Sequence, residues 1–127
     1  MNFTCHAMKF RIRLRTIVPG PEITRLELGG ALGTIKDKIF TAAGKDVRGY
    51  TKKGKLFLNF DTNLTENLTS MSITGSHLLT CGSHIYNHYV DCRDTNYYVC
   101  EDTITDVLAL PGEKVKNLMP VLACHDR

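Results

Sequence analysis

Polar and apolar residues alternate near the start of this chain with the two-residue period of a β-strand. Between Lys9 and Arg15 basic and apolar side chains alternate strictly, as they do in a strand with one buried and one exposed face. The first 21 residues are basic and contain no acid, as in transit peptides, but those sequences have the period of an amphipathic helix. The alternation therefore predicts a strand.

The rest of the chain consists of short apolar runs separated by glycine, proline and polar turn residues, and no run has the period of a helix of three turns or more. Residues 52–55 read as a hairpin loop whose glycine supplies a positive φ, and residues 93–96 read as a second turn. The class is all-β, with strands expected at residues 23–28, 38–43, 47–51, 56–60, 68–74, 77–81, 85–91, 97–100, 104–110 and 121–124.

The strand pattern repeats along the chain. The corresponding second strands end alike, in FTAAG, LLTCG and LACHD, and the repeat length is roughly 35 to 46 residues, the range of four-stranded propeller blades. The pattern favours a partial β-propeller of the WD40-like type with about three blades, although other antiparallel β architectures would give the same rhythm.

We expect residues 1–127 to form a fragment of one propeller domain. In this interpretation residues 3–17 supply the closing strands of one blade, residues 23–60 and 68–101 form two complete blades, and residues 104–127 begin a truncated one. A closed ring usually needs at least four blades, and each blade is stabilised by its neighbours. The pattern therefore predicts that the chain is part of a larger ring, and that alone it would be prone to aggregation.

Composition limits the possible functions. Hydrophobic residues make up 43% of the 127 residues and the net charge is +3, which is low for an electrostatically driven nucleic-acid binder. A nucleic-acid module using Arg11, Arg13 and Arg15 is a third-ranked alternative. No apolar run approaches the roughly 20 residues that span a bilayer. Five cysteines and no hydrophobic leader favour a reducing compartment.

The stretch CGSHIYNHYVDC places Cys81, His84, His88 and Cys92 at spacings that resemble a compact zinc site. Zinc requires four donors within about 2.0 to 2.3 Å of one ion. The residues between the histidines favour a strand, in which four residues span about 13 Å. Both imidazoles could not then reach one ion, so we expect no metal here.

A cysteine nucleophile assisted by histidine is the other chemical hypothesis. It would use Cys81 with His77 or His84, or Cys124 with His125. No nucleophile elbow or supporting third group is recognisable, and buried cysteine is commonly a small hydrophobe. We therefore expect no catalytic, metal or cofactor residues, and keep a small cysteine- or zinc-dependent enzyme built on residues 81–92 as the alternative function.

Several long segments resemble a known family. PGPEITRLELGG, KIFTAAGKDVRGYTKKGKLFLNFDTNLTE, HIYNHYVDCRDTNYYV and MPVLACHDR together resemble the N-terminal β-propeller of the Bardet-Biedl syndrome 7 family. The resemblance covers approximately residues 18 to 127. It implies a noncatalytic scaffold subunit of the BBSome, a coat-like adaptor complex that carries membrane proteins into and out of primary cilia.

The resemblance also implies partners and a location. The partners would be other BBSome subunits, with Bardet-Biedl proteins two and nine as the nearest neighbours, and ciliary membrane-protein cargo through the whole complex. Membrane contact would be indirect, and no nucleic acid or cofactor is implied. The implied locations are the cytoplasm, the cilium, the basal body or centrosome, and the ciliary membrane as a peripheral component.

Exposed aromatic and basic side chains are the interaction candidates, because aromatic residues and arginine are enriched at interface hot spots. Tyr86 and Tyr97 could equally be core residues of a blade, and a lysine-rich hairpin tip is commonly solvated. The candidates are Tyr50, Lys52, Lys53, Tyr86, Tyr89 and Arg93.

Overall fold

The computed structural model describes residues 22–30, 35–111 and 118–125. The strand expected at residues 9–15 and the blade strands expected at residues 3–17 lie outside this part of the chain. The described residues form ten strands, which confirms the all-β prediction: β1 (Ile23–Gly29), β2 (Lys38–Ala43), β3 (Asp46–Thr51), β4 (Leu56–Asp61), β5 (Ser70–Thr74), β6 (His77–Cys81), β7 (Ile85–Val90), β8 (Arg93–Val99), β9 (Ile104–Pro111) and β10 (Leu118–Cys124).

The strands form two four-stranded antiparallel sheets and one hairpin. The sheet orders are β1-β2-β3-β4 and β5-β6-β7-β8, and β9 pairs with β10. Within each sheet, strands that are consecutive in the chain are thus neighbours. The β3–β4 hairpin closes where its loop was expected, with Gly54 at φ 86° and its N–H donating to the Thr51 carbonyl at 2.8 Å.

The sequence predicts the turn between β7 and β8 at residues 93–96, but the turn lies at Asp91 and Cys92. Both residues have positive φ, of 50° and 61°, as in the two-residue turns that match the twist of a hairpin. β8 therefore begins at Arg93 and includes the polar residues read as a turn. It is an edge strand with every residue exposed, so polar side chains are compatible with it.

The last strand begins three residues before its expected start at Val121. Leu118, Met119 and Pro120 all pair with β9, and Pro120 lies opposite Ala109. Proline argues against an internal strand because it cannot donate to the ladder, but an edge strand accepts it. Among the described strands β10 is at an edge.

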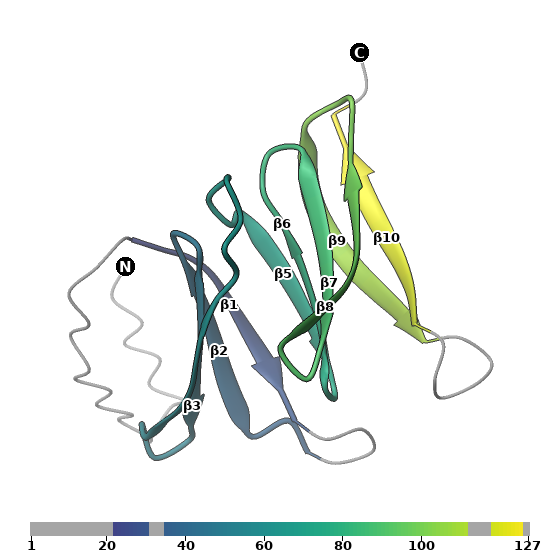
Figure 1. Ribbon diagram of the computed structural model, residues 1–127. Helices are drawn as coiled ribbons and strands as arrows, with labels where there is room; N and C mark the ends of the chain where they lie inside the picture. The colour runs from purple at the N-terminus through teal and green to yellow at the C-terminus, as the bar shows by residue number, and fades with distance from the viewer. Residues whose placement is uncertain (1–21, 31–34, 112–117, 126–127) are drawn as a thin grey trace, which may run out of the picture.

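The sheets follow one another across the molecule and bury a separate core at each junction (Figure 1). The first core joins Ala42 and Val47 of the first sheet to Met71, Leu78 and Tyr89 of the second. The second core consists of Leu79, Cys81 and Tyr86 from the second sheet with Ile104 and Val107 of β9. The second sheet is therefore covered on both faces.

The strands β1, β5 and β9, each the first of its sheet or hairpin, lie side by side. Asp106 of β9 accepts a hydrogen bond from the Ser70 hydroxyl of β5 and lies 3.9 Å from the Arg25 guanidinium of β1. The Ser70 hydrogen bond is the main cause that lowers the pKa of the Asp106 carboxyl. Polar contacts thus join three consecutive units at one edge.

Candidate interaction surface

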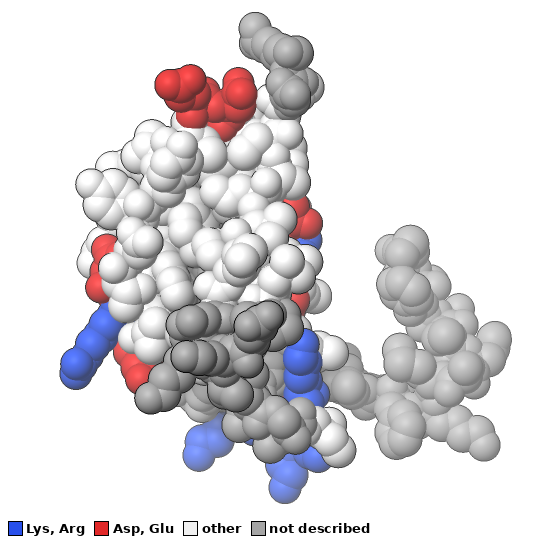
Figure 2. Space-filling view, turned by 90° about the vertical axis from the view of Figure 1, so that its right-hand side faces the viewer, with Lys and Arg blue, Asp and Glu red and all other residues white. Residues whose placement is uncertain are grey.

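The β9–β10 hairpin presents an apolar face that no described residue covers. Leu108 lies opposite Val121, and Leu110 lies opposite Met119, so all four side chains are on the same face. They are between 41% and 62% exposed. We call these four residues the outer β9–β10 face. Figure 2 views the molecule from this side, and charged residues lie mainly at the margins of the surface.

The opposite face of the same hairpin is a core surface. Val107 is 2% exposed and packs with Leu79 and Tyr86 of the second sheet. The hairpin is thus apolar on both faces, which is the composition of a sheet that is covered on both sides. Exposed apolar patches of this kind mark sites of contact.

A second exposed apolar strip follows the edge strand β8. Tyr97, Tyr98 and Val99 are each at least 58% exposed. Side chains alternate between the faces of a strand, so the two tyrosines point to opposite sides. Among the described strands β8 pairs only with β7, which leaves backbone groups available along its other edge. The sequence interpretation missed Tyr98 and allowed Tyr97 as a core residue.

All three tyrosines among the interaction candidates are buried. This corrects the expectation that Tyr50 and Tyr89 are exposed, and for Tyr86 it agrees with the alternative of a core residue. Tyr50, Tyr86 and Tyr89 are at most 9% exposed. Tyr89 donates a hydrogen bond to the Thr62 carbonyl at 3.3 Å, and its ring meets that of Phe60 edge to face with centroids 5.0 Å apart. Burial is the main cause that raises the pKa of Tyr89 to about 12.

The three basic candidates are on the surface. Lys52 and Lys53 are exposed in the β3–β4 loop, and Arg93 is exposed at the first position of β8. They belong to different sheets. The structure therefore does not gather the six candidates into one site.

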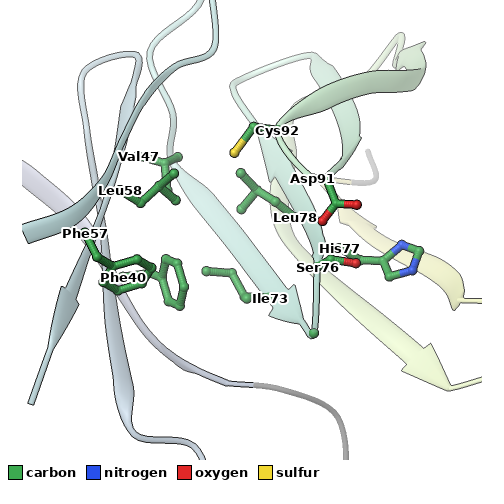
Figure 3. Close-up of a pocket in the computed structure, with 11 residues that line it drawn as sticks. Phe40, Val47, Phe57, Leu58, Ile73, Ser76, His77, Leu78, Asp91 and Cys92 are labelled. Atoms are coloured by element: carbon green, nitrogen blue, oxygen red, sulfur yellow. The ribbon is translucent and has the colours of Figure 1, made fainter.

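A cavity of 240 Å³ lies between the two four-stranded sheets (Figure 3). Apolar side chains from both sheets line it, among them Phe40, Phe57 and Ile73. The His77 imidazole is directed away from this apolar group in Figure 3. The cavity is thus a gap in the packing between the sheets, and its described lining residues include no cluster of charged side chains.

The residues of the zinc hypothesis have separate partners. His88 Nε2 lies 3.0 Å from Nδ1 of His77, and burial followed by the His77 charge lowers the pKa of His88. His84 instead lies 3.5 Å from the Glu66 carboxylate. In the described ranges no group of three or more histidine, cysteine, aspartate or glutamate side chains could hold a metal ion.

The residues of the nucleophile hypothesis lie in unlike surroundings. Cys81 is fully buried, and burial is the main cause that raises the pKa of its thiol, which suppresses the reactive thiolate. Cys124 and His125 are exposed at the end of β10.

The described part of the chain contains no helix that is long and apolar enough to cross a bilayer.

Comparisons with known proteins match nearly the whole chain. Residues 3–127 match the family model described as the BBS7 beta-propeller. The chain is 57% identical over 110 residues to the BBSome complex member BBS7 of Mus musculus, with 87% of this chain covered. It is 37% identical over 110 residues to BBSome complex member bbs-7 of Caenorhabditis elegans, with 84% of this chain covered. The matched region is 15% of the length of each relative.

The fold is also found in a solved structure. The chain is similar to the crystal structure of Kluyvelomyces marxianus Hsv2, with a TM-score of 0.60 over 84% of this chain and 32% of that one. The sequence identity is 9%, so this likeness concerns the fold alone. With the family match, it confirms the prediction of a partial β-propeller.

Proposed function

The chain belongs to the BBS7 β-propeller family, and from this premise we propose that it is part of the propeller of a BBSome subunit and acts as a noncatalytic scaffold. The observation that carries the proposal is the family match over residues 3–127. A scaffold of this kind works by holding partner surfaces in fixed positions, as part of a complex that moves membrane proteins into and out of cilia.

The distribution of apolar surface supports a position inside a larger ring. In a propeller each blade is stabilised by its neighbours, and the second sheet here is covered by apolar residues on both faces. The outer β9–β10 face has the same apolar composition, and none of the described residues covers it. We infer that residues 23–60 and 68–101 are two complete blades and that the next strands of the full-length protein cover this face.

Edge strand β8 is the proposed contact with sister subunits. Exposed tyrosine and arginine side chains are favourable anchors in interfaces, and β8 offers Tyr97 and Tyr98 together with Arg93. Lys52 and Lys53 extend the proposal to the β3–β4 loop. The expected partners are Bardet-Biedl proteins two and nine, with cargo and membrane reached through the assembled complex at the cilium and basal body.

The test is recovery of sister subunits with the full-length protein from ciliated cells that lack the endogenous copy. The unaltered protein should retain Bardet-Biedl proteins two and nine. A Y97S/Y98S variant should retain several-fold less, because large aromatic side chains dominate interface energies. Asn59→Ser, at an exposed position on β4, is the matched control and should behave like the unaltered protein.

Two results would count against the proposal at different levels. Absence of every BBSome subunit from the unaltered protein's complexes would remove the scaffold function itself. Full retention of the subunits by Y97S/Y98S would remove only the β8 contact. Each variant must also be recovered at the same molecular size as the unaltered protein. This control ensures that a misfolded variant is not mistaken for one that has lost binding.

A further inference from the structure

Two cysteines from different parts of the fold lie close together at one end of the molecule. Cys100 follows β8 directly, and Cys124 is the last residue of β10. Their sulfur atoms are 3.7 Å apart although 24 residues separate them in the chain. Cys124 belongs to the β9–β10 hairpin and Cys100 precedes it in sequence, so the pair connects the end of that hairpin to the second sheet.

The backbone fixes the positions of both cysteines. The Cys100 N–H donates to the His84 carbonyl at 2.7 Å. Cys124 pairs with Ile104, and the next residue, His125, donates its N–H to the Thr103 carbonyl at 2.8 Å. Since hydrogen bonds anchor both backbones, the approach of the two sulfur atoms is a property of the fold.

The pair is open to solvent. Cys124 is exposed and Cys100 is half-buried. A polar hollow of 330 Å³ beside them is lined by His84, Glu101, Asp102, Thr103 and His125, which include the residues that follow each cysteine. A small hydrophilic oxidant can therefore reach the thiols, in contrast to Cys81, which is buried.

We propose that Cys100 and Cys124 form a reversible dithiol–disulfide site that joins the second sheet to the β9–β10 hairpin. In the structure both cysteines are free thiols. Disulfide formation brings the sulfur atoms from 3.7 Å to about 2.05 Å. The inference does not depend on the proposed scaffold function.

The oxidation balances with hydrogen peroxide as the oxidant. The thiolate of exposed Cys124 attacks one peroxide oxygen, the O–O bond breaks, and the hydroxide that leaves takes the proton released by the Cys124 thiol. Cys100 sulfur then attacks the sulfenic acid, forming the S–S bond, while its proton leaves with the hydroxyl group as water. Two thiols are oxidised by two electrons, and one peroxide is reduced to two waters.

Cys124 is the attacking thiol and Cys100 the resolving thiol. Burial and the neighbouring Cys124 raise the pKa of the Cys100 thiol, which lowers its thiolate fraction at neutral pH. Cys124 is the more accessible of the two. The disulfide would prevent the hairpin from separating from the second sheet at this end.

The test treats the full-length protein with hydrogen peroxide, blocks free thiols with N-ethylmaleimide and analyses peptides by mass spectrometry without reductant. We expect a cross-linked peptide containing Cys100 and Cys124, lighter by two hydrogens than its parts. Alkylation of Cys124 should fall about tenfold and return after reduction. Cys92→Ser removes another exposed cysteine and should leave the cross-link unchanged.

A second measurement uses phenylarsine oxide, which bridges two neighbouring thiols but holds a single thiol weakly. It should protect Cys124 from alkylation in the unaltered protein and fail to do so in Cys100→Ser. Equal alkylation of Cys124 before and after peroxide would overturn the proposal. Oxidation of Cys124 to sulfinic acid without a cross-link, or its preferential pairing with a cysteine other than Cys100, would overturn it as well.

Discussion

Tyr86 and Tyr89 are two buried phenols of strand β7 that differ in their hydrogen bonding. The Tyr89 hydroxyl donates to the Thr62 carbonyl, whereas the Tyr86 hydroxyl has no hydrogen-bond partner among the described residues. Burial is the cause that raises the pKa of Tyr86. Removing a satisfied hydroxyl and removing an unsatisfied one should therefore have opposite consequences.

We predict that Tyr89→Phe lowers the opening free energy of β7 by about 1 kcal/mol, because it leaves the Thr62 carbonyl without its donor. Tyr86→Phe should leave that free energy unchanged or raise it, because it removes a desolvated hydroxyl. Amide hydrogen exchange along β7 in the full-length protein measures both. An equal loss of this free energy in the two variants would contradict the difference in hydrogen bonding between the two tyrosines.

The burial of these tyrosines could not be predicted from the alternation of residues. Tyr86 packs in the second core and Tyr89 in the first, so they occupy opposite faces of one sheet. A sheet that is covered on both faces loses the contrast between an apolar and a polar side. For β7 the pattern therefore indicates a strand but not which of its side chains are accessible.

At the scale of elements, the connection between β6 and β7 depends on one carboxylate. Glu66 Oε2 accepts hydrogen bonds from the N–H groups of His84 and Ile85, at 2.9 and 3.1 Å. The His84 N–H is the main cause that lowers the pKa of Glu66. A Cβ at Gly82 would lie 2.5 Å from the same oxygen, so glycine is required for this approach.

We predict that Glu66→Ala raises the exchange rate of the His84 and Ile85 amides at least about tenfold, since each loses a charged acceptor. The folded pKa of Glu66 is depressed, so its stabilisation is present above pH 4.5 and is lost as the pH falls through the lowered pKa. Protection of these amides should decline over that acidic range. Glu66→Gln should not show this decline, and an identical pH profile would refute the role of the charge.

The β7–β8 turn contains a residue in a strained backbone conformation. Cys92 has a φ of 61°, a region in which a residue other than glycine is strained by about 1 kcal/mol or more. Cys92→Gly should relieve this strain and stabilise the hairpin, whereas Cys92→Val should destabilise it because branched side chains fit this region poorly. The rates of amide hydrogen exchange along β8 distinguish these two variants. Equal effects would show that the turn conformation is not what limits the hairpin.

At the scale of the whole molecule, neighbouring residues of β9 point into opposite environments. Leu108 belongs to the outer β9–β10 face, and Val107 is buried against the second sheet. We predict that the 127-residue chain alone self-associates through the outer face, and that L108E/M119K reduces this association while the strand content is kept. Val107→Glu should instead unfold the hairpin, because it buries an unpaired charge at a penalty of several kcal/mol.

Light scattering and circular dichroism of the isolated chain test this prediction. Light scattering should give a larger particle size for the unaltered chain than for L108E/M119K. Circular dichroism should give similar far-ultraviolet spectra for the two chains. If L108E/M119K associates as strongly as the unaltered chain, the outer face is not the contact. If Val107→Glu keeps the full strand signal, the distinction between the two faces of β9 is wrong.

Much of the architecture could be predicted from the chain, because each sheet consists of consecutive strands marked by local turn residues. The loop at Gly54 and the strands Lys38–Ala43 and His77–Cys81 lie where they were expected. The contact of Cys100 with Cys124 could not be predicted in this way, because it depends on how the hairpin sits against the second sheet. Surface sites that arise from stacking need the three-dimensional structure.

The same succession of strands affects how the chain folds during synthesis. Residues 23–61 contain all strands of the first sheet, and residues 70–99 contain all strands of the second. Each sheet can form soon after its own residues leave the ribosome, since local contacts close quickly. On our proposal that the next strands of the full-length protein cover the outer β9–β10 face, this face stays uncovered on the nascent chain until those strands emerge. During that interval the growing protein presents Leu108, Leu110, Met119 and Val121 as an apolar surface of the kind that chaperones recognise.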